Sequence, residues 1–391
     1  MRRKPEALKR ALAELDAQHL RRYPGIAVDS ELDFSSNDYL GLRHHPAVRT
    51  AMADCALSTV AGAGASHLIS GHHAAHDALE HALAEFTGYP AALVFSTGYM
   101  ANLGVLTALL ERDDLLLQDR LNHASLIDAG LLARVRESHR YPHANAAAAR
   151  ERLQEFRQRR GEAAALLATD GVFSMDGDVA PLAELAAACH AHEAWLVVDD
   201  AHGIGVIGAD GRGSLEHHGL KAADVPVLIG TFGKALGTFG AFVAGDKALL
   251  DWLLQRARTY IYTTALPPPV AAATTQALQL VTAEKWRREK LAELIGRFKD
   301  GAARRGLSLL PSDTPIQPLV IGDVQRTLAA SHALRARGLR VTAIRPPTVP
   351  NGSARLRVTL SARHERPQLD MLLDALSASL EPSQPVTELA S

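Results

Sequence analysis

Short apolar runs alternate with helix-patterned stretches from about Pro46 onward. The runs are apolar on both faces, which is typical of strands buried in a parallel sheet. The stretches between them, such as NLGVLTALLER and PLAELAAACHAH, have apolar residues at helical spacing. The alternation predicts βαβ units around a mostly parallel central sheet in an α/β fold. The strand candidates are AALVF (91–95), DLLLQ (114–118), AALLAT (164–169), WLVVD (195–199) and VLIGT (227–231).

The pattern changes near TTALPPPVAAATTQ, where prolines begin a long helical stretch rich in Lys, Arg and Glu. Beyond it, strands are predicted near IQPLVIG and ARLRVTL, which indicates a smaller α+β domain. At 391 residues the chain also exceeds what one hydrophobic core usually serves. We therefore predict an N-terminal helix and extension (1–45), a large α/β domain (46–275) and a small C-terminal α+β domain (276–391).

Composition and charge exclude several classes of protein. Hydrophobic residues make up 47% and charged residues 22% of the chain, as in ordinary globular proteins. Lys and Arg number 42 against 43 Asp and Glu, so no global field attracts nucleic acid or an anionic membrane. The first 25 residues are charged and amphipathic, which predicts a surface helix and not a signal peptide. The two cysteines, Cys55 and Cys189, are too few for a disulfide framework and predict a cytoplasmic location.

Most of the predicted strands end in a polar residue. Ligands of open α/β sheets bind outside the carboxyl ends of the strands, so these side chains are expected to meet in one crevice. Polar residues also end strands simply because they form turns. The residue types therefore have to decide between the two interpretations. The strand-ending residues are Ser96, Asp119, Asp170, Asp199 and Thr231.

The segment VVDDAHGIGVIG places Asp199 at the end of a buried strand and His202 three residues later in a Gly-rich turn. A buried carboxylate needs a cationic partner, because an unpaired buried charge is costly. The protonated ring nitrogen of a cofactor meets this need. Pyridoxal phosphate is such a cofactor: a carboxylate keeps its pyridinium nitrogen protonated, and a lysine Schiff base attaches it to the protein.

Lys234 is the candidate for that lysine. It follows the strand VLIGT in a glycine-dense loop, GTFGKALG, which lets a cofactor approach the backbone closely. Most lysines are solvated surface charges, but the apolar neighbours here favour a neutral, nucleophilic amine. A nucleotide P-loop is excluded, because the positions that need glycine and Ser or Thr are Leu228 and Ala235.

The segment STGYMAN (96–102) follows the strand AALVF and opens an apolar helix. This is the order that a phosphate site at a helix N-terminus requires. Gly98 and Tyr99 are expected to give main-chain donors, and Thr231 a hydroxyl group. The alternative is an ordinary helix cap by Ser96 or Thr97.

Two of the 18 histidines are candidates for the same site. His123, in DRLNHASL, is expected to lie over a planar cofactor, and His202 to hydrogen-bond the cofactor's phenolic oxygen. A metal site is the competing interpretation, with Asp199, Asp200 and His202, or the histidines of HHAAH (72–76), as ligands. Neither set has a recognisable zinc spacing, and DGVFSMDGD misses the calcium-loop spacing. No metal is therefore predicted.

Together these motifs closely resemble the α-oxoamine synthases, a family of fold-type I pyridoxal phosphate enzymes. The resemblance runs from about Leu20 to residue 375. It implies a large domain with a mostly parallel central sheet and a smaller C-terminal α+β domain. The motifs that carry it are FSSNDYLGL (34–42), DRLNHASL (119–126), GVFSMDGD (171–178), VDDAHGIGVIG (198–208), GTFGKALG (230–237) and AIRPPTVP (343–350).

The resemblance assigns roles to single residues. Lys234 would attach the cofactor, Asp199 would pair with its pyridine nitrogen, His123 would stack on the ring and His202 would contact the phenolic oxygen. Thr263 or Thr264 would reach the phosphate of the neighbouring subunit, which implies a homodimer with the active site at the subunit interface. The remaining cofactor contacts would be Gly98, Tyr99, Ser174 and Thr231. The substrate would be contacted by Arg21, with Arg22 as the alternative at this position, and by Asn37, His123, Thr348 and Arg357.

The motif AIRPPTVP, with IQPLVIG before it, resembles one branch of the family. This implies an acyltransferase that joins L-alanine to a pimeloyl thioester, releases CO2 and yields 8-amino-7-oxononanoate for biotin biosynthesis. The acyl donor is pimeloyl-CoA or pimeloyl-[acyl-carrier protein], and both stay open. A sister activity, glycine C-acetyltransferase, with glycine and acetyl-CoA as substrates, is the alternative. From another class, a non-catalytic or metal-binding protein could use the same fold.

Overall fold

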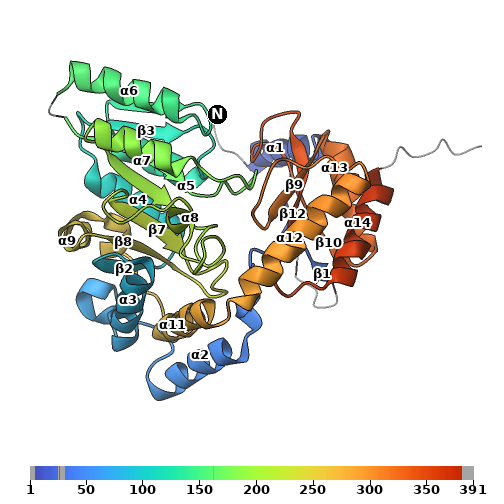
Figure 1. The fold of residues 1–391 in the computed structure, drawn as a ribbon, viewed down its shortest axis with the longest axis horizontal. Coiled ribbons are helices and arrows are strands. Elements are labelled where there is room, and N and C mark those ends of the chain that lie inside the picture. Colours follow the sequence, from blue (N-terminus) through green and yellow to red (C-terminus); the bar gives the residue numbers. More distant parts are fainter. Residues whose placement is uncertain (1–4, 25, 27–30, 162, 381–391) are drawn as a thin grey trace, which may run out of the picture. The chain divides into compact units, whose positions relative to one another are not determined.

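The computed structural model describes residues 5–24, 26, 31–161 and 163–380, and it divides into two compact units (Figure 1). The larger unit is Asn37–Leu291, and the smaller one combines the described residues before Asn37 with those from Ala292 onward. The divisions predicted from the sequence fall elsewhere. One lies directly before α2 (Pro46–Ser58), and the other lies within α11 (Pro268–Ala283).

The larger unit is built around a seven-stranded sheet with the order β2-β8-β7-β6-β5-β3-β4. β8 runs antiparallel to both of its neighbours, and the other adjacent pairs are parallel. The prediction of an α/β fold with a mostly parallel central sheet is therefore confirmed. The strands are β2 (Ala91–Phe95), β3 (Leu115–Asp119), β4 (Glu137–Tyr141), β5 (Ala165–Asp170), β6 (Trp195–Asp199), β7 (Val227–Thr231) and β8 (Ala241–Gly245).

All five strands predicted for this sheet are present, but the sequence pattern missed its two other strands. β4 is the edge strand ESHRY, and three of its five side chains are exposed, so it carries no apolar run. β8 is apolar and fully buried, but it directly follows the glycine-dense loop and did not stand out from it. Pairing with a neighbouring strand, and not local pattern, decides both elements.

Helices cover both faces of this sheet. One face shares a buried core with α4, α5, α9 and α10, in which Leu93, Leu166 and Val197 are members. Because side chains alternate along a strand, their sequence neighbours face the opposite layer, where α3, α6 and α7 pack. The helices are α2 (Pro46–Ser58), α3 (Ala74–Thr87), α4 (Gly98–Leu109), α5 (Ala124–Ala133), α6 (Ala146–Arg159), α7 (Leu182–Ala191), α8 (Ser214–His217), α9 (Lys247–Arg256), α10 (Arg258–Ile261) and α11 (Pro268–Ala283), with the short turns η1 (Leu42–His44) and η2 (His67–Gly71).

The smaller unit contains two small sheets. β9, β11 and β12 form an antiparallel sheet of order β11-β12-β9, and β1 pairs with β10 in parallel. The strands predicted near IQPLVIG and ARLRVTL are β9 and β12. The elements are α1 (Pro5–Ala17), β1 (Leu32–Asp33), α12 (Trp286–Arg304, which begins in the larger unit), β9 (Ile316–Gly322), α13 (Val324–Ala336), β10 (Leu339–Arg340), β11 (Thr342–Ile344), β12 (Ala354–Thr359) and α14 (Arg366–Leu380).

The predicted N-terminal surface helix is α1, which buries none of its residues. Residues 1–4 and 25 of the predicted stretch lie outside the described part of the chain. Among the described helices, none combines the length and apolar character that crossing a membrane requires.

Candidate active site

A cavity in the larger unit lies at the carboxyl ends of β5, β6 and β7. Eight of the predicted cofactor residues line it, from segments far apart in the sequence. Three further lining residues, Ser125, Asp170 and Ala201, received no role in the sequence prediction. The eight predicted residues are Gly98, Tyr99, His123, Ser174, Asp199, His202, Thr231 and Lys234.

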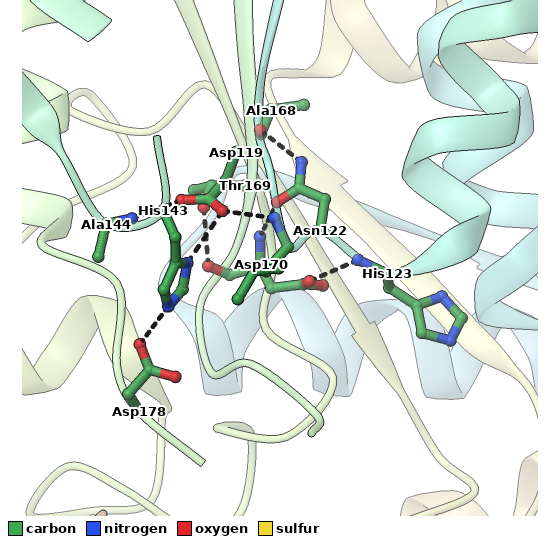
Figure 2. A network of polar contacts seen from close by, with 10 residues as sticks. Asp119, Asn122, His123, His143, Ala144, Ala168, Thr169, Asp170 and Asp178 are labelled. Carbon is green, nitrogen blue, oxygen red and sulfur yellow. Dashed lines mark hydrogen bonds and ion pairs between the residues drawn. The ribbon is translucent and has the colours of Figure 1, made fainter. Parts of the chain in front are cut away.

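The strand-ending polar residues divide into two groups. Asp170, Asp199 and Thr231 line the cavity, and the parallel register of β5 and β6 sets Asp170 opposite Asp199. Ser96 and Asp119 do not line it. Ser96 Oγ donates to the Thr264 carbonyl (3.2 Å), and Asp119 is buried in a polar network with His143 (Figure 2). The expected convergence therefore holds for three adjacent strands.

Asp199 is buried at the end of β6 and is oriented by two donors. The Asn102 side-chain amide donates to Asp199 Oδ2 (2.6 Å), and the Ala201 N–H donates to Oδ1 (3.1 Å). Asn102 is buried on the otherwise apolar helix α4. A polar side chain in such a helix was the signal that could have revealed it.

The same amide links Asp199 to His123. Asn102 Nδ2 also donates to Ser125 Oγ (2.8 Å), which is 2.7 Å from His123 Nδ1. The Ser125 N–H donates to the same ring nitrogen (3.2 Å). Nδ1 therefore acts as an acceptor, which leaves the proton of the neutral ring on Nε2. Burial lowers the pKa of His123, and this also favours the neutral ring.

His202 is held by Tyr39, a residue of the FSSNDYLGL motif to which the sequence analysis gave no role. Tyr39 Oη is 2.7 Å from His202 Nδ1, and the same hydroxyl donates to Asn37 Oδ1 (3.1 Å). Tyr39 is fully buried. The predicted substrate residue Asn37 thus belongs to the polar network around His202.

Lys234 lies just past the end of β7, half-buried between the buried residues Phe232 and Ala235. Its loop is closed by the Gly237 N–H, which donates to the Lys234 carbonyl (2.9 Å). Gly237 has φ +67°, and a Cβ there would come within 2.3 Å of the Arg43 nitrogen. Only glycine therefore fits this turn without strain.

The first turn of α4 borders the cavity as the phosphate-site prediction requires. Thr97 Oγ1 caps the helix by accepting from the Met100 N–H (3.1 Å), so the cap that the sequence offered as an alternative is present. This cap leaves the N–H groups of Gly98 and Tyr99 outside the helical ladder. A Cβ at Gly98 would meet no protein atom within 4 Å. The cap and an anion site are therefore compatible here.

Two further buried carboxylates flank Asp199. Burial, reinforced by the charge of Asp199, raises the pKa of Asp170 well above its usual range. Burial also raises the pKa of Asp200 to about 7, although Ser214 donates to it through its N–H (2.6 Å) and its hydroxyl. Asp200 faces away from the cavity and anchors the loop that follows His202.

The remaining predicted residues lie elsewhere in the chain. Thr263 and Thr264 lie between α10 and α11 and do not line the cavity. Arg21, Thr348 and Arg357 belong to the smaller unit. There the Arg22 guanidinium donates to Thr348 Oγ1 (2.8 Å), whereas Arg21 pairs with Asp16 (2.6 Å). Arg357 is buried in β12.

The histidines of HHAAH considered as metal ligands are engaged with the protein, and their cluster includes His67, which the sequence analysis did not propose as a ligand. His67, His72 and His76 gather with ligand atoms within 4.8 Å of one another. His76 Nδ1 accepts from the His73 N–H (2.9 Å), however, and Nε2 lies 2.6 Å from the Leu266 carbonyl. A hydrogen bond joins the Nδ1 atoms of His67 and His72 (2.9 Å). Both nitrogens of His76 are thus committed.

Comparison with known proteins places the chain among its relatives. The profile of the aminotransferase class I and II family matches residues 29–376. The 8-amino-7-oxononanoate synthase of Methylococcus capsulatus is 56% identical over 378 residues, which cover 94% of this chain and 96% of that protein. The chain belongs to the 8-amino-7-oxononanoate synthase family. The resemblance predicted from the motifs is thereby confirmed.

Solved structures confirm the fold of this member of the 8-amino-7-oxononanoate synthase family. A serine palmitoyltransferase variant from S. paucimobilis with a bound PLP–myriocin aldimine matches with a TM-score of 0.89 at 28% identity, over 96% of each chain. The 8-amino-7-oxononanoate synthase of Francisella tularensis matches with a TM-score of 0.76 at 28% identity, over 90% of this chain and 98% of that one. Fold-type I architecture is therefore shown.

Proposed function

We propose that the chain catalyses the decarboxylative condensation of L-alanine with a pimeloyl thioester, giving 8-amino-7-oxononanoate, CO2 and the free thiol. The pimeloyl group is carried by CoA or by an acyl-carrier protein. The observation that carries the proposal is that this chain, a member of the family, has Lys234, Asp199 and two histidines in the lining of a single cavity. The carboxylate, the amine and the helix N-terminus are the groups that pyridoxal phosphate needs.

The cavity fits this cofactor in the chemistry of its lining. Lys234 supplies the amine that attaches it, and Asp199 the anion that pairs with its pyridine nitrogen. The N–H groups of Gly98 and Tyr99 would be donors for its phosphate. The Thr231 hydroxyl, which donates to the Gly240 carbonyl (2.9 Å) in this structure, would join them by turning its proton to the phosphate. When bound, pyridoxal phosphate withdraws electrons from bonds to the α-carbon of the amino acid, first C–H and later the bond to the carboxylate.

The protein groups orient the reactants and move protons. Lys234 Nζ, once released from the cofactor, accepts the α-proton of alanine and later returns a proton to the product. His123 would face the ring with a neutral imidazole, because the Ser125 hydroxyl and N–H both contact its Nδ1. His202, held by Tyr39, would contact the phenolic oxygen, and Ser174 would complete this edge of the site.

We further propose a homodimer. Thr263 or Thr264 then reaches the phosphate bound by the neighbouring subunit, which is consistent with their place outside the cavity of their own chain. In the smaller unit, the Arg22–Thr348 hydrogen bond supports Arg22 as a substrate contact, while Arg21 remains the residue the sequence favours. Arg357 and Asn37 bind the amino-acid carboxylate in this proposal. A cytoplasmic location also remains a prediction.

A paired assay tests the function. The purified protein, saturated with pyridoxal phosphate, is given alanine with pimeloyl-CoA or pimeloyl-[acyl-carrier protein], and in parallel glycine with acetyl-CoA. We expect the first combination to give the higher kcat/KM, measured by thiol release and by mass spectrometry of the product. A preference for glycine and acetyl-CoA would instead support glycine C-acetyltransferase, the alternative on the same scaffold.

Asn102→Ala is expected to weaken cofactor binding roughly tenfold, because Asp199 loses a donor that orients its carboxylate. The measurement is a titration of the apoprotein with pyridoxal phosphate, followed by visible absorbance. Gln154→Ala, which removes an exposed amide from α6, is the matched control and should leave the dissociation constant unchanged. An equal affinity in both variants would remove Asn102 from the site.

A further inference from the structure

His143 does not line the cavity, but it contacts two segments that do. It follows β4, in the connection to α6. Its Nδ1 is 3.0 Å from Asp119 Oδ1, and its Nε2 is 2.9 Å from Asp178 Oδ2 (Figure 2). Ionised carboxylates only accept hydrogen bonds, so both ring nitrogens must donate. His143 is therefore an imidazolium held between two anions.

Asp119 connects this imidazolium to the turn that carries His123. Asp119 is fully buried, and its carboxylate also accepts from the Leu121 N–H (2.8 Å) and the Ala144 N–H (2.8 Å). Without His143, this anion would have no cationic partner among these contacts. Loss of the His143 imidazolium would therefore destabilise the turn that leads from β3 to His123.

The turn is fixed to β5 at its far end. Asn122 Nδ2 donates to the Ala168 carbonyl (2.8 Å), and Asn122 Oδ1 accepts from the Asp170 N–H (3.2 Å). The His123 N–H then donates to Asp170 Oδ2 (2.7 Å), and its ring points away from the network, as Figure 2 shows. The position of the His123 ring thus depends on a rigid path that begins at Asp119.

On its other side, His143 holds the loop that carries Ser174. This loop folds back on itself: the Phe173 N–H donates to the Asp178 carbonyl (3.0 Å), and the Gly177 N–H donates to the Phe173 carbonyl (2.8 Å). The His143 ring packs edge-on against Phe173, with centroids 4.4 Å apart, and bonds Asp178. It therefore contacts both arms of the loop.

We propose that His143 is a positioning residue of the cofactor site, whose imidazolium ties the turn carrying His123 to the loop carrying Ser174 and so fixes two walls of the cavity. The inference rests on the proposed function, because it takes the cavity as the cofactor site. Asp176 and Asp178 also make this a candidate metal cluster. Both ring nitrogens of His143 lie within hydrogen-bond distance of carboxylate oxygens, which favours the ion-pair interpretation over a metal site.

The stabilisation by the His143 imidazolium holds over a defined pH range. Burial lowers the pKa of His143, but hydrogen bonds to Asp119 and Asp178 outweigh this and raise it to about 10. The charged groups that face the ring are Asp119 from β3 and Asp176 and Asp178 from the loop. Because the folded-state pKa lies above the ordinary value, the stabilisation is fully present below about pH 6.5 and is lost as the pH rises through about 10.

The test compares three variants of the holoenzyme. His143→Gln removes the charge, His143→Arg keeps a cation with several donors, and His139→Gln changes an exposed histidine of β4 as the control. Visible circular dichroism of bound pyridoxal phosphate and its dissociation constant are measured from neutral pH to about pH 11, together with kcat and KM. We expect His143→Gln to weaken cofactor binding roughly ten- to hundredfold at neutral pH, with reduced dichroism.

His143→Arg should restore the dichroism and move its alkaline loss to higher pH, and His139→Gln should match the wild type. A His143→Gln protein that unfolds more easily but keeps wild-type dichroism and cofactor affinity would overturn the proposal. If His143→Gln does not fold, the arginine variant decides, and a folded arginine variant without dichroism would overturn it equally. Wild-type protein that binds cofactor but forms no product would refute the proposed function alone, since the dichroism still reports on His143.

Discussion

Lys234→Ala is expected to lower turnover of alanine and pimeloyl thioester by roughly a thousandfold or more. The methyl group can neither attach the cofactor nor accept the α-proton, and a positioned proton-transfer group alone is worth about 10²–10⁴ in rate. Lys234 is half-buried at the end of β7, and it is the lysine that lines the cavity. The measurement is the steady-state rate in excess pyridoxal phosphate.

The control is Lys247→Ala, which removes an exposed lysine of α9 that pairs with Asp251. It should leave turnover unchanged. Borohydride reduction of the wild-type protein, followed by peptide mapping, should place the cofactor on the peptide that contains Lys234. Unimpaired turnover in Lys234→Ala, or a label on a different lysine, would contradict the assignment.

Asp199→Asn is expected to produce the second largest loss, roughly a hundredfold in kcat/KM. Losing one partner of a buried charge pair typically costs about 3 kcal/mol or more, and each 1.36 kcal/mol of barrier is a factor of ten in rate. The neutral amide cannot hold the proton on the pyridine nitrogen, and its single oxygen can accept from only one of the two donors, Asn102 and Ala201, that hold the carboxylate.

The rate loss should be accompanied by a changed visible spectrum of the bound cofactor, which separates an electronic effect from simple unfolding. Asp251→Asn serves as the matched control, since its carboxylate is exposed on α9 and contacts only the nearby Lys247 among the ion pairs described. Wild-type kcat/KM in Asp199→Asn would mean that another group carries the pairing role.

Asp170 illustrates what sequence reasoning reached in part. Its position at a strand end was visible, but no role followed from that position alone. The structure sets it opposite Asp199 and gives it the His123 N–H as a donor. The raised pKa of Asp170 favours its protonated form, whereas the proposed role of Asp199 requires a charged carboxylate, so the two neighbouring acids have different chemical properties. This separation depends on strand register and burial, which the sequence does not display.

Local sequence determined the parts of this protein whose signal is local. Apolar runs identified five strands of the central sheet, the Gly-rich turns marked the positions of Lys234 and His202, and the motif set indicated the family that the relatives confirm. These signals work because buried parallel strands need continuous apolar residues and tight turns need glycine.

Tertiary structure alone decided which polar residues act together. It places Tyr39, Asn102 and Ser125 in contact with residues of the predicted site. It leaves Ser96 and Asp119 outside the cavity, and it sets His143 between Asp119 and Asp178. The physical reason is that a hydrogen bond depends on distances of about 3 Å between groups far apart along the chain. Such distances are set by sheet order and packing, so no pattern within one segment can encode them.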